Sequence, residues 1–178
     1  MTDGNPSQRY RIMVDVTALG EVLIDFTPYG VSEGGQALFE QNPGGAPANV
    51  LAAVARLGGT AAFIGKVGDD MHGKLLRETL EKEGIDVQGM IEDPDYFTTL
   101  AFVALKNGER SFSFARKPGA DTHLRKEEIP MGVIQNTKIF HCGSLSLTDE
   151  PARSATMYAV EEAKKAGALI SYDHNYRP

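Results

Sequence analysis

The sequence predicts an α/β fold in which a mostly parallel sheet is covered by helices on both faces. Strand-like apolar runs and helix-like amphipathic segments alternate along the 178 residues, and this alternation is typical of a doubly wound sheet. Each helix-like segment is followed by a glycine, which suits a helix end. One pair of strand-like runs, 98–105 and 110–116, interrupts the alternation. We therefore expect a small additional β unit beside the main sheet.

The runs that we expect to form buried strands are short and rich in apolar and β-branched side chains. They are residues 16–26, 60–65, 138–143 and 168–173. We expect the first of these, VTALGEVLIDF, to be a single strand because it is apolar almost throughout.

Three segments have the periodicity of amphipathic helices, with apolar residues recurring every three or four positions. They are residues 46–57, 71–83 and 150–166. Pro47 suits the first turn of the first helix, where its missing N–H costs nothing. Gly58 follows the end of the same helix and supplies the stop.

The strand-like pair 98–105 and 110–116 is joined around Asn107-Gly108, a dipeptide that favours a tight turn between antiparallel strands. A hairpin of two strands is only marginally stable alone, so we expect residues 30–42 to supply a further strand. The alternative is that the hairpin adds two more strands to the central sheet.

The domain organisation that we expect is a flexible tail at residues 1–10 and one domain over 11–178, with lid segments at about 27–43 and 96–118. The tail is polar and has no apolar segment of the secretory type. No run approaches the ~20 apolar residues that cross a bilayer. We expect no membrane partner.

The composition bounds the partners. The net charge is −6, whereas a protein that binds nucleic acid shows a basic surface and a high isoelectric point; we expect no nucleic-acid partner. The single cysteine, Cys142, cannot form a disulfide within the chain, which favours a reduced, cytoplasmic setting. It lies in an apolar run, which favours a packing role over the alternative of a reactive thiol.

The segment Gly44-Gly45-Ala46-Pro47-Ala48-Asn49 is the first candidate site. Paired glycines let the backbone approach a ligand, and the helix that follows offers free N–H groups. Asn49 adds one donor and one acceptor. The alternative is an ordinary tight turn before a helix. The spacing does not fit the GxGxxG fingerprint of dinucleotide sites.

Asp25 is the second candidate, because a carboxylate at the end of an apolar strand is costly to bury without partners. Ligands of open α/β sheets bind at the carboxyl ends of the strands, where Asp25 could accept hydrogen bonds from a polyol. The alternative is a surface aspartate that begins a loop.

Two further segments carry polar groups next to strands. Asp173, Asn175 and Arg177 follow the last strand, and an acid, an amide and a guanidinium suit the surroundings of a metal and a phosphate; the alternative is a solvated loop. In the hairpin, Phe112 and Phe114 face one way at strand period and Arg116 lies beyond them. They could close over a ligand or simply pack at a sheet edge.

The sequence lacks the signatures of several other chemistries. The histidines show no metal-ligand spacing, and there is no cysteine pair or HExxH motif. There is no GxSxG nucleophile elbow and no Walker A loop.

Taken together and in this order, the motifs resemble the ribokinase-like (PfkB-type) carbohydrate kinases, and most closely the fructokinases among them. The resemblance covers about residues 16–178. The matching segments are GEVLIDF, PGGAPANV, ARLGG, FIGKVG, FARKPGAD, FHCGSLSL and SYDHNYRP. Leu51 stands where a small residue is usual, and His174 where a proline is common.

The resemblance implies roles residue by residue. Asp25, Gly44, Gly45 and Asn49 match the sugar-binding positions of the family. Arg116 matches a lid residue that reaches toward the sugar. The residues that match a loop near the metal and the transferred phosphate are Asp173, Asn175 and Arg177.

The resemblance also implies a reaction, the transfer of the γ-phosphoryl group of Mg²⁺-bound ATP to the 6-hydroxyl of D-fructose. Family members continue with a second half that holds a Gly-Ala-Gly-Asp motif, whose aspartate is the catalytic base, and most of the nucleotide pocket. This sequence contains no Gly-Ala-Gly-Asp, so we expect no catalytic residue in the chain and no activity from it alone. The partners expected are fructose, ATP and a second copy paired through the β lid. The alternative function is a non-catalytic sugar-binding or scaffold fragment.

Overall fold

The computed structural model describes residues 13–106 and 109–175. The tail expected at 1–10, the Asn107-Gly108 turn and Arg177 lie outside the described residues.

The central sheet has five strands in the order β5-β4-β1-β8-β9, and every pairing within it is parallel. Its strands are β1 (Val14–Leu19), β4 (Ala61–Gly68), β5 (Asp86–Asp93), β8 (Thr137–Gly143) and β9 (Leu169–Asp173). Parallel neighbours require a crossover between them, and the helices expected from the sequence supply these crossovers.

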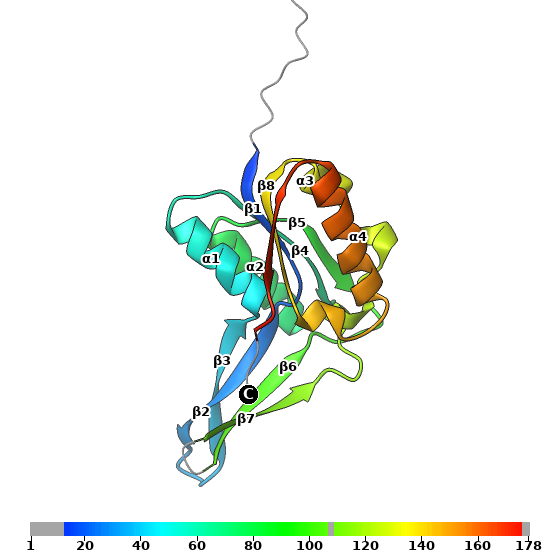
Figure 1. Cartoon of the computed structure of the whole chain (residues 1–178). Coiled ribbons are helices and arrows are strands. Elements are labelled where there is room, and N and C mark those ends of the chain that lie inside the picture. The colour runs from blue at the N-terminus through cyan, green and yellow to red at the C-terminus, as the bar shows by residue number, and fades with distance from the viewer. Residues whose placement is uncertain (1–12, 107–108, 176–178) are drawn as a thin grey trace, which may run out of the picture.

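Helices cover both faces of the central sheet (Figure 1). Their bounds are α1 (Ala46–Arg56), α2 (Met71–Lys82), α3 (Met131–Ile134) and α4 (Ala152–Lys165), with short 3₁₀ turns at Ala120–His123, Lys126–Glu128 and Leu145–Leu147. Side chains alternate across β1: Val16 and Ala18 pack with α1 and α2, whereas Leu19 packs with α3 and α4. The predicted doubly wound α/β fold class is confirmed.

A second sheet of four strands, in the order β3-β2-β6-β7, lies beyond one end of the central sheet (Figure 1). Its strands are β2 (Leu23–Val31), β3 (Ala37–Gly44), β6 (Leu100–Lys106) and β7 (Glu109–Ala115). β2 pairs antiparallel with β3 and parallel with β6, and β6 pairs antiparallel with β7. The hairpin is therefore separate from the central sheet, and the region expected to add a strand contains most of β3.

The prediction of one strand over residues 16–26 is wrong. The chain leaves the central sheet after Leu19 and enters the second sheet at Leu23. The apolar pattern hides this break, because Leu19, Val22 and Ile24 are all buried, although they lie on either side of it. At Gly20 the backbone passes so close to α1 that a Cβ would lie 2.5 Å from Cγ of Pro47.

Candidate functional site

A pocket of about 670 Å³ lies where the carboxyl ends of the central strands meet one face of the second sheet. Its lining residues come from the segments after β1, β8 and β9, from the start of α1, and from β2, β3, β6 and β7. They are Glu21, Leu23, Asp25, Thr27, Pro28, Asn42, Gly45, Ala46, Asn49, Val103, Phe112, Phe114, Gly143, Ser144, Leu145 and Asn175. Ligands of open α/β sheets bind at this end of the strands.

The strand β2 contributes a row of side chains to the pocket. Alternate residues of a strand point to the same side, and Leu23, Asp25 and Thr27 all line the pocket. Asn42 lies opposite Asp25 in the register of β2 and β3, and its Nδ2 donates to Oγ1 of Thr27 at 2.9 Å. Apolar and polar groups therefore share this wall, as is usual in small-molecule sites.

The structure requires glycine at positions 44 and 45, because a side chain at either position would clash with neighbouring atoms. A Cβ at Gly44 would overlap Oδ2 of Asp25, and a Cβ at Gly45 would lie 2.5 Å from the backbone oxygen of Glu21. Gly45 also has φ +114°, which side chains rarely adopt. It caps the start of α1. Because its neighbours Ala46 and Asn49 line the pocket too, the N-terminal end of α1 forms part of the wall.

Glu21 is a pocket residue that the sequence interpretation passed over in favour of Asp25. Its side chain is only 5% exposed, and Oε1 accepts a hydrogen bond from the backbone N–H of Ala46 at 3.0 Å. Burial raises the pKa of this carboxyl above its ordinary value. The available signal was the same one used for Asp25, a carboxylate inside an apolar run.

Phe112 and Phe114 of β7 line the opposite wall. Their rings are stacked with centroids 6.1 Å apart, and they remain 40% and 48% exposed. The strand period therefore places both aromatic side chains on the pocket face of the second sheet, with Val103 of β6 beside them in register with Phe112.

Arg116 is not among the residues that line the pocket. Its Nε donates to Oδ2 of Asp121 at 2.8 Å, one terminal nitrogen donates to the backbone oxygen of Leu145 at 3.0 Å, and the other donates to Oγ1 of Thr148 at 3.2 Å. Asp121 also accepts from Oγ1 of Thr99 at 2.5 Å. Arg116 thus ties the end of β7 to the segment after β8, which carries pocket residues.

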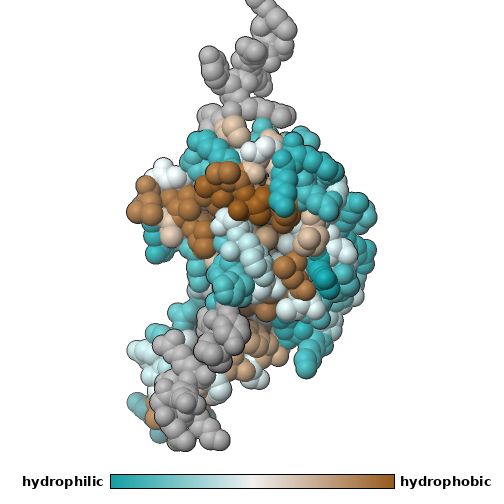
Figure 2. Space-filling model, in the orientation of Figure 1, coloured by the Kyte–Doolittle hydropathy of each residue, from teal (hydrophilic) through white to brown (hydrophobic). Residues whose placement is uncertain are grey.

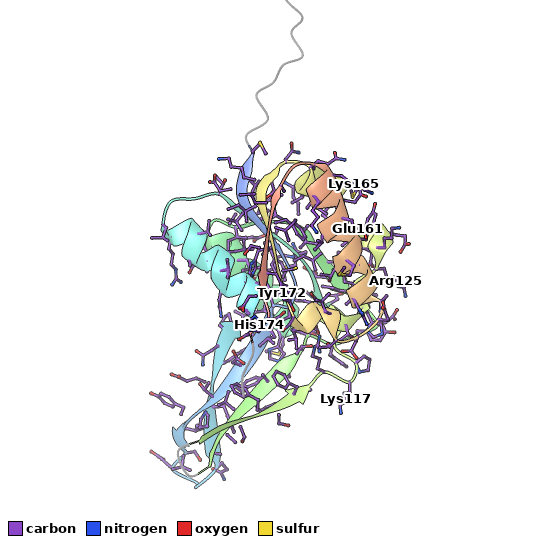
Figure 3. The ribbon with its side chains drawn as sticks, in the orientation of Figure 1. Lys117, Arg125, Glu161, Lys165, Tyr172 and His174 are labelled. Carbon is purple, nitrogen blue, oxygen red and sulfur yellow. The ribbon has the colours of Figure 1, made fainter. Side chains whose placement is uncertain are left out.

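The segment after β9 approaches the pocket from the central sheet. Asn175 lines the pocket, and its backbone N–H donates to Oδ1 of Asp173 at 2.8 Å. The backbone oxygen of His174 accepts from Oγ of Ser144 at 2.9 Å, and Figure 3 shows His174 at the end of β9 that points toward the second sheet. Asp173 itself is not in the pocket wall, and Arg177 lies outside the described residues.

Comparison with known protein families shows to which family the chain belongs. The family model described as pfkB family carbohydrate kinase matches residues 13–178. The chain belongs to the pfkB family of carbohydrate kinases.

Relatives within the pfkB family include plant and bacterial fructokinases. The chain is 53% identical over 165 residues to a probable fructokinase-3 of Arabidopsis thaliana, covering 91% of this chain and 48% of the relative. It is 50% identical to fructokinase-2 of Oryza sativa, with 91% and 49% covered. The crystal structure of fructokinase from Xylella fastidiosa superposes with a TM-score of 0.88 at 42% identity, covering 92% of this chain and 51% of that one.

A fructokinase from Vibrio cholerae, determined with fructose, ADP and potassium, has a TM-score of 0.81 at 39% identity, with 95% of this chain and 53% of that chain covered. The chain thus spans about half the length of the pfkB relatives that it matches.

The described part of the chain offers few ligands for a metal ion. It contains no group of three or more His, Cys, Asp or Glu side chains placed to hold one. Asp173 and Asn175 provide oxygen atoms of the type that Mg²⁺ accepts, and Mg²⁺ in kinases is held largely by substrate phosphates and water. The residues therefore fit a neighbourhood of metal-bound phosphate rather than a protein cage. No helix within the described ranges is long and apolar enough to cross a membrane.

Proposed function

We propose that the complete protein to which this chain contributes is a cytoplasmic fructokinase, which transfers the γ-phosphoryl group of Mg²⁺-bound ATP to the 6-hydroxyl of D-fructose. The observation that carries the proposal is the pocket between the two sheets, where Asp25, Gly45 and Asn49 line one continuous cavity. In this proposal the chain supplies the sugar-binding half of the enzyme and its β lid.

The pocket groups have distinct roles in this proposal. The carboxylate of Asp25 accepts hydrogen bonds from sugar hydroxyls, which is the strong, charge-assisted type. Gly44 and Gly45 let the sugar approach the backbone, and Asn49 donates and accepts beside them. Phosphoryl transfer depends mainly on positioning and electrostatic stabilisation, so these contacts serve the reaction by fixing the acceptor hydroxyl.

The second sheet acts as the lid in this proposal. Phe112 and Phe114 lie on the pocket side of β7, where closure over the sugar would exclude water from the transferred phosphoryl group. Arg116 acts as a positioning residue, because its contacts join the end of β7 to Asp121 and to Leu145, a pocket residue in the segment after β8. Exposed aromatic side chains on the lid also suit a homodimer in which two lids cover each other.

Asp173, Asn175 and Arg177 are proposed to lie near the phosphate and its Mg²⁺. The nucleotide site, the base and the anion hole are supplied by sequence outside this chain, since no Gly-Ala-Gly-Asp motif occurs here. Loss of a general base costs about 10²–10⁴ in rate, and loss of one donor to a developing negative charge costs about 10²–10³.

The test compares the 178-residue chain with the complete protein in an assay that couples ADP release to fructose. We expect turnover from the complete protein and none from the chain alone. Turnover by the purified chain at an ordinary kinase rate would contradict the division of labour. Absence of fructose phosphorylation by the complete protein would contradict the proposed activity itself.

A second candidate is a sugar-binding module that does no chemistry, which is favoured by the lack of the base motif in the sequence. The DNA downstream of Pro178 separates the two. A reading frame that continues into Gly-Ala-Gly-Asp supports the kinase, and an immediate stop codon supports the binding module.

A further inference from the structure

Glu21 has one carboxylate oxygen in use and one without a partner. It lies in the short segment that joins β1 to β2, and 5% of it is exposed. Oε1 accepts from the backbone N–H of Ala46. Oε2 is buried and has no hydrogen-bond partner among the described residues.

Unpartnered buried side-chain atoms are rare in folded proteins and each needs an explanation. In the described part of the chain there are three, on Thr17, Glu21 and His141. Of these residues only Glu21 lines the pocket. The other two lie within strands of the central sheet and are not among the lining residues.

The groups around Glu21 favour a further hydrogen-bond donor to its carboxylate. Burial raises the pKa of this carboxyl, and the carboxylate of Asp121 adds to the effect, whereas the backbone N–H groups of Glu21 itself and of Ala46, and the Arg116 guanidinium, lower it. Arg116 is committed to Asp121 at 2.8 Å. An additional hydrogen bond to Oε2 would therefore stabilise the ionised form. Because Glu21 is among the residues that line the pocket, a ligand bound there is the candidate donor.

Glu21 and Asp25 flank the paired glycines. The carboxylate of Asp25 lies against Gly44, and that of Glu21 reaches Ala46 on the other side of Gly45. Two acid groups on either side of this glycine pair, of which Gly45 lines the pocket, suit a ligand that carries several hydroxyl donors.

From this arrangement we infer that Glu21 is a second sugar-binding acid, whose Oε2 accepts a hydrogen bond from a hydroxyl of the sugar while Oε1 stays on the N–H of Ala46. The inference rests on the proposed fructokinase function and adds a specificity-determining residue to its pocket. It orients the sugar directly against the start of α1.

A purely structural role of Glu21 would require only one of its two carboxylate oxygens. To hold the first turn of α1, Glu21 needs only Oε1, and the amide oxygen of glutamine can accept the same bond. To bind a hydroxyl donor through Oε2 it needs a second acceptor, which glutamine replaces with an N–H donor. The variant Glu21→Gln therefore separates the two roles.

The experiment measures steady-state kinetics and thermal unfolding of the complete protein, as wild type and as Glu21→Gln. We expect the KM for fructose to rise about tenfold or more, as for a lost hydrogen bond to a charged group. We expect kcat and the KM for ATP to stay within about threefold, and the Tm to be no lower than that of wild type, because burial of the charge is relieved. The matched control is Glu128→Gln, which removes an acid that pairs with buried Lys66 and lies outside the pocket wall; its fructose KM should not change.

A series of fructose analogues that each lack one hydroxyl identifies the contact. For one analogue the wild type and Glu21→Gln should have equal KM values, because the bond is already missing. A fructose KM that stays within about twofold of wild type, or an equal loss for every analogue accompanied by a lower Tm, overturns the inference.

If the wild type does not phosphorylate fructose, the proposed function fails, and calorimetric binding of D-fructose then decides the role of Glu21. Affinity weakened about tenfold in Glu21→Gln supports that role, and equal affinity or no binding by the wild type overturns it.

Discussion

Asp25 is the residue on which the sequence and the structure agree most directly. The sequence singled it out as a carboxylate at a strand end, and it lies half-buried in the pocket wall, in register between Asn42 of β3 and Ala101 of β6. Its neighbours on both strands are fixed by backbone pairing. The pairing therefore fixes the face of β2 from which the Asp25 side chain leaves the strand, and this face lines the pocket.

Replacing Asp25 by asparagine tests its proposed contact with the sugar. The side chain keeps its shape but loses a charge-assisted acceptor, which is worth about 1.5–3 kcal/mol. In the complete protein the KM for fructose should rise by roughly 10- to 100-fold, with kcat largely retained. The control is Glu81→Gln on the exposed side of α2. A fructose KM within about twofold of wild type together with a large fall in kcat would assign Asp25 a different role.

Glu21 makes a separate prediction about stability and pH. Burial raises its pKa above the ordinary value of 4.5, so the folded chain takes up a proton there more readily than the unfolded chain. The unfavourable contribution of this group is therefore absent below about pH 4.5 and grows as the pH rises. At about pH 7 Glu21→Gln should be more stable than wild type in urea, and the difference should disappear near pH 4. A variant that is equally destabilised at both pH values would show that the acid mainly supports the fold.

Among the elements, α2 is tied to the second sheet through Asp70, the residue that caps its N-terminus. Oδ1 of Asp70 accepts the backbone N–H groups of His72 and Gly73, both at 2.9 Å, and so caps α2. Oδ2 accepts the N–H of Thr98 at 2.8 Å, just before β6. Burial alone would raise the pKa of Asp70, but these hydrogen bonds outweigh it and lower the pKa. One side chain thus serves both a helix start and a strand start.

Removing this side chain should be costly. Asp70→Ala leaves three N–H groups without their acceptor, and a lost helix cap with its companion bond costs about 1–3 kcal/mol. We expect this loss in the free energy of unfolding from urea titration. Asp86→Ala is the matched control, because Asp86 accepts one local N–H, from Gln88, at the start of edge strand β5. If the free energy of unfolding falls by the same amount in both variants, the link between α2 and β6 stabilises the fold no more than one local hydrogen bond does.

The elements that could be predicted are those whose pattern repeats over a buried face. The segments expected at 46–57, 71–83 and 150–166 correspond to α1, α2 and α4. β5 was missed because only Gly89 and Met90 of it are buried and acids dominate its ends. The break after Leu19 was missed because two different sheets bury the residues on either side of it.

A place in the pocket wall could be predicted where the position in a motif decides it, as with Asp25, Gly45 and Asn49, which line the pocket; their part in sugar binding stays a prediction. The contacts of Arg116 could not be predicted in the same way, because two of its three hydrogen-bond partners among the described residues come from a distant part of the chain. Its contacts with Leu145 and Thr148 depend on how the segment after β8 lies against the second sheet. No local sequence pattern determines how these two parts of the chain lie against each other. The family resemblance implies that this guanidinium reaches toward the sugar, which stays a prediction; in the structure it contacts Asp121 and the segment after β8.

On the scale of the whole molecule, one side of the central sheet is incompletely covered. β9 is an edge strand, Leu169 on it is 70% exposed, and Leu57 at the end of α1 is 88% exposed. Figure 2 shows hydrophobic surface extending from α1 toward this edge. Exposed strand edges and apolar patches are sites of association between chains.

The 178-residue chain, when studied alone, should therefore self-associate. The double substitution Leu57→Lys and Leu169→Lys places charge on the patch and should shift the chain toward the monomer in sedimentation velocity. Tyr29→Lys is the control, since Tyr29 is equally exposed at 70% but lies on the second sheet. If the control dissociates the chain and the double variant does not, association runs through the lid instead.

The second sheet is built from two insertions in an otherwise regular βαβ chain. β2 and β3 are inserted between β1 and α1, and β6 and β7 between β5 and the turns that lead to β8. Its aromatic side chains Phe102, Phe112 and Phe114 remain 39–48% exposed, and its most buried apolar residues, Ile24 and Ala101, lie near the central sheet, so its outer part buries little apolar area. A segment of this kind opens at a lower free energy than the body to which it is attached. The amide protons of the second sheet should thus exchange with solvent through an opening that leaves the central sheet folded, which makes the lid and the body two separate cooperative units of one domain.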